Sequence, residues 1–72
     1  MRYDFRSFGR NLAAERARKR LTQEQLANLT EGEITAATIG TWERGVRYPT
    51  LDSVCCIANV LDLGLDQLVD QK

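Results

Sequence analysis

The side chains that could do chemistry in this sequence are mainly cations suited to binding anions. The chain holds ten lysines and arginines, no histidine and a net charge of zero. Residues 1–20 carry a local charge of +5, whereas residues 48–72 carry −3. A neutral chain with one basic end can still present a positive face to phosphate groups. The alternative interpretation of this asymmetry is an ordinary solvated surface.

Groups suited to catalysis or metal binding are scarce. Cys55 and Cys56 are adjacent, so on a helix they point about 100° apart and cannot pair with each other. Without histidine or a CxxC motif, no zinc site can be built at the usual spacings. We expect two reduced thiols, one half-buried and one exposed, with Asp52 raising the pKa of Cys56. No carboxylate pair has a pocket-forming context, so we predict no enzymatic activity, no metal and no cofactor.

These residues must be positioned by short helices. Apolar spacing predicts a first helix from residue 5 to residue 18, and Thr22, Thr35 and Thr50 are expected to cap the next three. Gln25 completes a capping box with Thr22. Gly45 is expected to end the third helix in a left-handed conformation. A last helical turn is expected near residues 65–69, after a break at Gly64. No alternating apolar pattern predicts a strand, and the expected fold class is therefore an all-α, compact five-helix bundle.

Length and composition fit one small globular domain. The chain has 72 residues, with 43% apolar and 28% charged side chains. It lacks a run of 18 apolar residues and an apolar N-terminal stretch, so we expect no membrane segment and a cytoplasmic location. The predicted core comprises Phe8, Leu12, Ala17, Leu21, Leu26, Ala27, Ile39, Trp42, Leu51, Val54, Ile57, Ala58, Leu61, Leu65 and Leu68.

Residues 21–51 carry a specific motif. Leu-Thr-Gln-Glu-Gln-Leu-Ala is followed by Ile-Thr-Ala-Ala-Thr-Ile-Gly-Thr-Trp-Glu-Arg-Gly and then by Tyr-Pro-Thr-Leu. This pattern closely resembles the phage repressor and Cro-like helix-turn-helix family of xenobiotic-response-element-type transcriptional regulators. The match extends to Leu-Asp-Gln-Leu-Val at residues 65–69 and back to Arg16, and so covers most of the chain.

The resemblance implies a lambda-repressor-like DNA-binding domain over residues 1–72. Residues 1–7 would form an N-terminal arm, 22–45 the helix-turn-helix, and 62–72 a possible dimerisation segment. The third helix would enter the major groove of double-stranded DNA. The implied function is a sequence-specific transcriptional regulator, a repressor acting as a homodimer. Dimerisation would use apolar residues that exceed the needs of one small core: Leu61, Leu63, Leu65 and Val69.

The resemblance also assigns roles to individual residues. Gln23 matches the family residue that binds the DNA backbone, and Arg16 and Glu43 match a pair that joins the first helix to the recognition helix. Arg44 and Arg47 fall where the family contacts phosphate. The predicted DNA-binding set is completed by Thr35, Ala36, Ala37, Thr38, Thr41, Arg18 and Lys19. The base-reading positions, which include Gly40, lack a bidentate amide or guanidinium, so specificity would rest partly on DNA shape, on the arm or on the loops.

Three alternatives stay open at the level of sequence. Arg18 and Lys19 could flank the DNA backbone or belong to a solvated helix face. The turn over residues 28–34 is about two residues longer than usual, and Glu31 and Glu33 would repel phosphate if it faces DNA. Finally, zero net charge and small residues on the recognition helix also fit a protein-interaction module, such as an antitoxin that grips a toxin.

Overall fold

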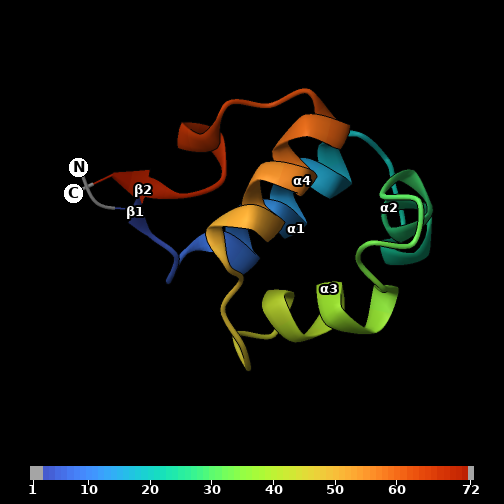
Figure 1. The fold of residues 1–72 in the computed structure, drawn as a ribbon, viewed down its shortest axis with the longest axis horizontal. Coiled ribbons are helices and arrows are strands. Elements are labelled where there is room, and N and C mark those ends of the chain that lie inside the picture. The colour runs from blue at the N-terminus through green and yellow to red at the C-terminus, as the bar shows by residue number, and fades with distance from the viewer. Residues whose placement is uncertain (1–2, 72) are drawn as a thin grey trace.

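The computed structural model describes residues 3–71 and shows a mostly helical fold (Figure 1). Along the chain lie β1 (Tyr3–Asp4), α1 (Phe8–Arg18), α2 (Gln23–Leu29), α3 (Ala36–Glu43), α4 (Leu51–Leu61), the 3-10 helix η1 (Leu65–Gln67) and β2 (Asp70–Gln71). The prediction of five α-helices is wrong, because residues 3–71 form four α-helices and the expected fifth is a three-residue 3-10 helix. No helix within residues 3–71 is long and apolar enough to cross a membrane.

Three threonines begin the helices as their sequence positions predicted. Thr22 Oγ1 accepts from the Gln25 backbone N–H at 3.0 Å, and Gln25 Oε1 accepts in return from the Thr22 N–H at 2.8 Å. Thr35 and Thr50 cap α3 and α4 by accepting from the backbone N–H groups of Thr38 and Ser53, without the reciprocal bond. Each cap satisfies a backbone donor that the helix itself leaves unpaired. These local bonds fix where α2, α3 and α4 begin.

The helix boundaries differ from the predicted ones in two places. α1 begins at Phe8, three residues after the predicted start. α4 ends because Asp62 adopts a left-handed conformation with φ of 56°, and Gly64 is not the breaking residue. At the end of α3, by contrast, Gly45 takes the positive φ of 74° that the sequence predicted for it.

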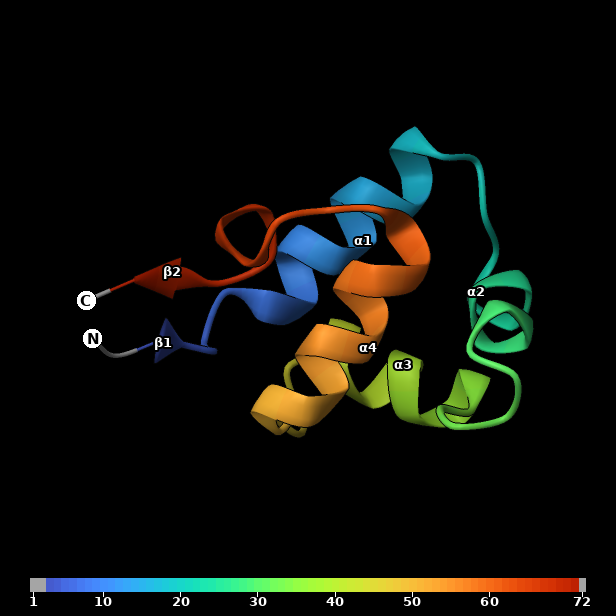
Figure 2. The same cartoon turned by 45° about the horizontal axis from the view of Figure 1, so that its top comes forward.

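A short antiparallel pairing joins the two ends of the described chain. Tyr3 lies opposite Gln71, and Asp4 opposite Asp70. Figures 1 and 2 show these strands side by side at one end of the molecule. The expectation of no sheet was therefore wrong, because strands of two residues are too short to leave an alternating pattern in the sequence.

The core lies between the helices and is closed by the C-terminal segment. Phe8 and Trp42 meet edge-to-face, with ring centroids 5.4 Å apart. Within residues 3–71, the buried apolar cluster consists of thirteen residues: Phe8, Leu12, Leu26, Ala27, Ile34, Ile39, Trp42, Val54, Ile57, Ala58, Leu61, Leu68 and Val69. Of the predicted core, Ala17 and Leu51 are exposed, and Leu21 and Leu65 only pack against it. Ile34 and Val69 were missed.

The C-terminal segment does not carry the surplus of apolar surface predicted for it. Leu61 and Val69 are 3% and 1% exposed, and Leu63 and Leu65 are partly buried against the core. Asn11 on α1 ties the segment down further by donating to the Leu68 carbonyl at 3.0 Å. A single copy of the chain therefore buries Leu61 and Val69 and part of Leu63 and Leu65, and dimerisation through residues 62–72 stays a prediction. Lys72 lies outside the described residues.

Candidate nucleic-acid interface

Helix α3 lies along one edge of the molecule, with α1 and α2 packed on its inner side (Figure 1). Its inward positions Ile39 and Trp42 are buried. Residues 37, 40, 41 and 44 follow helical spacing and share the outer side of the helix. The sequence therefore divides α3 into an apolar face that holds it to the core and an outer face of small residues that ends at Arg44.

An ion pair fixes α3 to α1. Arg16 donates from Nε and Nη2 to the two carboxylate oxygens of Glu43, both at 2.9 Å. A third donor, Arg16 Nη1, reaches the Leu21 carbonyl at 2.7 Å. Both side chains are largely shielded, with exposed fractions of 20% and 10%. A bidentate pair of this kind sets the relative orientation of two helices more than it stabilises them.

Gln23, the first residue of α2, joins the same network. Its Nε2 donates to Glu43 Oε1 at 3.1 Å, so one carboxylate holds both Arg16 and Gln23. The Gln23 side chain is thereby drawn across to α3. The sequence-predicted residues Arg16, Gln23 and Glu43 thus form one connected polar cluster beside the outer face of α3.

The cluster favours the ionised form of Glu43. Burial alone would raise the pKa of this carboxyl, but the hydrogen bonds from Arg16 and Gln23 and the Arg16 charge outweigh it, and the pKa lies below its ordinary value of 4.5. The same pairing raises the pKa of Arg16. A carboxyl whose pKa is lowered by folding stabilises the fold above its unfolded pKa, and this stabilisation is lost as the pH falls through the folded pKa.

We therefore expect Glu43→Gln to remove part of the acid sensitivity of the fold. The free energy of unfolding of the unchanged protein should fall as the pH drops below about 5, and that of Glu43→Gln should fall less, although the variant is less stable at pH 7. Urea unfolding followed by circular dichroism from pH 7 to pH 3 measures both. Glu31→Gln, at an exposed site, is the matched control. Parallel curves for the unchanged protein and Glu43→Gln would contradict the role of the cluster.

The predicted groove-facing residues of α3 carry few polar groups that could read bases. Ala37 is exposed, and Ala36 and Thr41 are half-buried. The Thr41 hydroxyl donates to the Thr38 carbonyl one turn back at 2.7 Å. Thr35 and Thr38 are joined by their hydroxyls at 3.0 Å at the start of the helix. This surface suits close approach and methyl contact better than hydrogen-bonded readout.

Arg44 adds a cation to this surface from the end of α3. A Cβ built on Gly40 would lie 3.0 Å from Arg44 Nη1 and 3.5 Å from Gln23 Oε1. The two side chains therefore cover Gly40, which explains why this glycine is buried on an outward face. Arg47 is exposed in the following loop and lies apart from the cluster. The family resemblance had assigned both arginines to phosphate.

The two basic residues predicted to bind DNA at the end of α1 have different surroundings. Arg18 donates to Glu15 at 2.6 Å, and Glu15 is itself buried at 7% exposure. Arg18 is thus engaged within its own helix and is not brought to the cluster around Glu43. Lys19 is exposed at the C-cap of α1. A role in phosphate binding stays a prediction for both residues.

The lengthened turn between α2 and α3 leans toward α4. Its anchor is the buried Thr30, a residue that sequence reasoning missed, whose Oγ1 donates to the Ala27 carbonyl and accepts from the Ile34 N–H. Glu33 Oε2 accepts from Cys56 Sγ on α4 at 3.4 Å. Glu31 and Glu33 therefore line an open groove of about 680 Å³ with α4 and not the outer face of α3.

The two cysteines lie where the sequence predicted, one exposed and one half-buried. Burial raises the pKa of Cys56, and Glu33 adds to the effect through its hydrogen bond and its charge. The carboxylate that acts on this thiol is therefore Glu33 and not Asp52, which the sequence had suggested. Chain proximity favoured Asp52, whereas the turn brings Glu33 closer.

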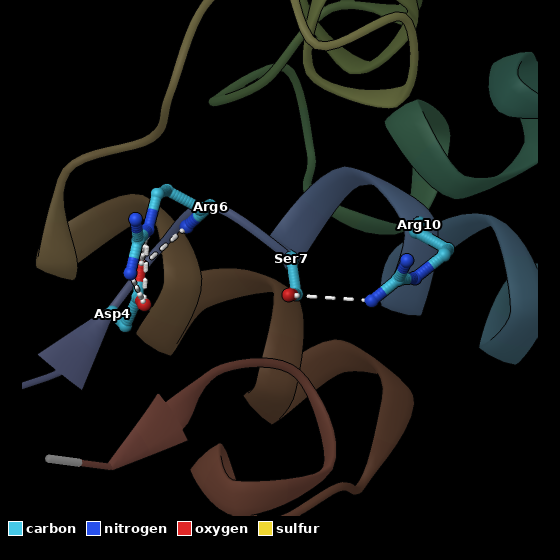
Figure 3. A network of polar contacts seen from close by, with 4 residues as sticks. All are labelled: Asp4, Arg6, Ser7 and Arg10. Atoms are coloured by element: carbon cyan, nitrogen blue, oxygen red, sulfur yellow. Dashed lines mark hydrogen bonds and ion pairs between the residues drawn. The ribbon is translucent and has the colours of Figure 1, made fainter.

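The N-terminal segment is held in place over its described part. Beyond the pairing of β1 with β2, Arg6 forms an ion pair with Asp4 at 2.7 Å, and Arg10 donates to the Ser7 hydroxyl at 3.4 Å (Figure 3). Residues 3 and 4 are therefore held by the C-terminal strand, and a role of residues 1–7 as a DNA-binding arm stays a prediction. Residues 1 and 2 lie outside the described residues.

Fold and site together define a helix-turn-helix domain of the Cro and C1 repressor type, and the comparisons agree. The helix-turn-helix family model matches residues 12–68, so the chain belongs to this family. It is 36% identical over 62 residues to the HTH-type transcriptional activator BcrR of Enterococcus faecalis, a match that covers 86% of this chain and 29% of BcrR. The crystal structure of the DNA-binding domain of BldD superposes with a TM-score of 0.79 at 23% identity, covering 90% of this chain and 92% of that one. This likeness shows the fold.

Proposed function

We propose that this chain binds double-stranded DNA through α3 and the start of α2 and thereby regulates transcription. Membership of the helix-turn-helix family supports the proposal, as does the similarity to a transcriptional activator. The observation that carries it is the cluster of Arg16, Glu43 and Gln23, which holds the first side chain of α2 beside the outer face of α3. A side chain held in advance loses little conformational freedom when it binds a phosphate.

The distribution of charge between α3 and the groove next to α4 also supports α3 as the DNA-binding surface. Gln23 and Arg44 lie over Gly40 on α3, and Arg47 is exposed in the loop that follows this helix, whereas Glu31, Glu33 and Asp52 line the groove next to α4. A polyanion therefore meets amide and guanidinium donors at α3 and carboxylates at the groove. Phosphate contacts of this kind would position the domain on the duplex, and small residues on α3 would allow its backbone to approach the bases closely.

Two finer parts of the proposal concern assembly and the sign of regulation. We propose a homodimer, because two copies related by a two-fold axis would read half-sites about 34 Å apart. The sequence-based choice of a repressor gains no support from a relative named as an activator, and the proposal is therefore a regulator of either sign.

The test is the salt dependence of binding to random duplex DNA. We expect the unchanged protein to bind with a clearly negative slope of log affinity against log salt. A Gln23→Ala/Arg47→Ala variant should bind about tenfold more weakly, with a slope reduced by about 1, because one phosphate-neutralising charge is lost. Fluorescence anisotropy with a labelled duplex pool measures both quantities.

Arg10→Ala is the control, because it also removes one positive charge but does so on α1, where Arg10 donates a hydrogen bond to the Ser7 hydroxyl. We expect its affinity and slope to stay close to those of the unchanged protein. Absence of binding at low salt would contradict the proposal. An equal effect of Arg10→Ala and the double substitution would show that binding is not localised to this surface.

A further inference from the structure

Helix α3 presents no side chain in its first two turns that could distinguish a guanine from an adenine. Positions 36, 37 and 40 hold alanine, alanine and glycine. Thr41 has committed its hydroxyl hydrogen to the Thr38 carbonyl. Bases are discriminated most strongly by paired donors or acceptors, such as the fork of an arginine on the O6 and N7 atoms of guanine. A side chain with such paired donors must therefore reach this surface from outside the first two turns of α3.

The side chain of Arg44 does so. In a helix, long side chains point back toward the N-terminus and cover the preceding turn. Arg44 follows this rule, and its Nη1 lies 3.0 Å from the place where a Cβ of residue 40 would stand. The guanidinium is thus moved about one turn, roughly 5 Å, from the end of α3 toward its middle. The missing side chain at Gly40 provides the room for it.

The guanidinium also keeps its donors for a ligand. The nearest carboxylate along the chain, Glu43, already accepts two hydrogen bonds from Arg16 and one from Gln23. Within residues 3–71, no hydrogen bond or ion pair engages the Arg44 side chain. Gln23 Oε1 lies 3.5 Å from the same position above Gly40 and so limits where the guanidinium can move. The Arg44 guanidinium is therefore positioned on the outer face of α3, and its donors remain free for a ligand.

We propose that Arg44 is the specificity-determining residue of this domain and that it reads a guanine in each half-site through the space above Gly40. The inference rests on the proposed DNA-binding function and assigns Arg44 a role different from the phosphate contact expected from its position at the helix end. Arg47, exposed in the following loop, keeps the sequence-independent role.

The test is selection of bound duplexes from a randomised pool, followed by affinity measurements on single-base variants of the selected site. The unchanged protein should select one fixed guanine per half-site and prefer it over adenine by about tenfold to a hundredfold. Arg44→Lys keeps the charge but loses the fork, so it should bind random DNA with a similar affinity and salt slope yet lose this preference. Arg47→Lys, the matched control, should keep it.

Gly40→Ala tests the geometry separately. The new methyl group would meet Nη1 of a flexible side chain, so the fold should persist, and alanine is the better helix former. The guanine preference should fall as it does in Arg44→Lys. The inference is overturned if Arg44→Lys selects the same site as the unchanged protein, or if the unchanged protein binds DNA without a fixed guanine. Failure to bind random DNA at all would instead contradict the proposed function.

Discussion

Replacing Gly9 by alanine will cost this protein much of its stability. The added Cβ would lie 1.9 Å from the Trp42 carbonyl oxygen, 2.8 Å from the Trp42 carbonyl carbon and 3.1 Å from the Glu43 Cα. All three are backbone atoms, so no change of rotamer relieves the overlap, and α1 must move away from α3. On helix propensity alone the substitution would stabilise α1 by about 1 kcal/mol. Close packing reverses that sign.

We expect Gly9→Ala to lower the free energy of unfolding by about 3 kcal/mol or more, in a domain of this size whose total is about 4–10 kcal/mol. The thermal midpoint should fall by more than about 12 °C, which circular dichroism measures directly. Gly32→Ala is the control, because Gly32 has a φ of 87° and open space around it. Its cost should stay near 1–2 kcal/mol. Similar melting of the two variants would show that α1 and α3 tolerate separation.

This contact matters for function because it sets where α3 lies. Phe8 and Gly9 on α1 hold the Trp42 end of α3, and the Arg16–Glu43 pair holds the same end from the polar side. Gln23 and Arg44 are placed only relative to that helix. A displacement of α3 by the width of one methyl group would therefore move the whole candidate interface.

Features governed by neighbouring residues could be predicted from the sequence. The capping box of Thr22 and Gln25 and the left-handed Gly45 depend on residues within a few positions of each other, and the structure shows both. The pairing of Arg16 with Glu43 spans 27 residues and was reached only through the family motif. No spacing rule on this chain alone would have found it.

Features governed by distant contacts could not be predicted. The β1–β2 pair depends on two chain ends meeting, and Val69 is buried because the segment after α4 folds back. Leu51 continues the apolar stripe of α4 yet is 44% exposed, because it lies in the first turn beyond the reach of the core. Hydrophobic spacing shows which side of a helix is apolar, but not how far along the helix the core extends.

The direction of individual side chains also could not be predicted from the sequence. The position of Arg44 at the end of α3 suggested a contact at the helix end, whereas its side chain lies over Gly40. The acidic turn could have faced either way, and the Thr30 anchor with the Glu33–Cys56 contact decides for α4. The Arg44 side chain depends on the space above Gly40, and the turn depends on the contacts of Thr30 and Glu33. Neither feature leaves a periodic signal in the sequence.

Ala37→Glu should abolish most DNA binding while leaving the fold intact. Ala37 is exposed in the first turn of α3, where a negative side chain is favoured by the helix dipole, so stability should not fall. Against DNA the same carboxylate would meet phosphate at close range, where two like charges 4 Å apart repel by about 4 kcal/mol near a protein surface. We expect an affinity loss on the order of a hundredfold or more.

The most direct measurement is the affinity of a labelled duplex for the unchanged protein, for Ala37→Glu and for Asn59→Glu, at about 0.1 M salt. Asn59 is exposed on α4 beside the acidic groove, so its substitution makes the same change of charge away from α3. At this salt, charges more than about 10 Å apart are largely screened. The account predicts a hundredfold loss for Ala37→Glu and a change within about threefold for Asn59→Glu. Equal affinities for Ala37→Glu and the unchanged protein, or a larger loss for Asn59→Glu, would contradict the claim that α3 binds DNA.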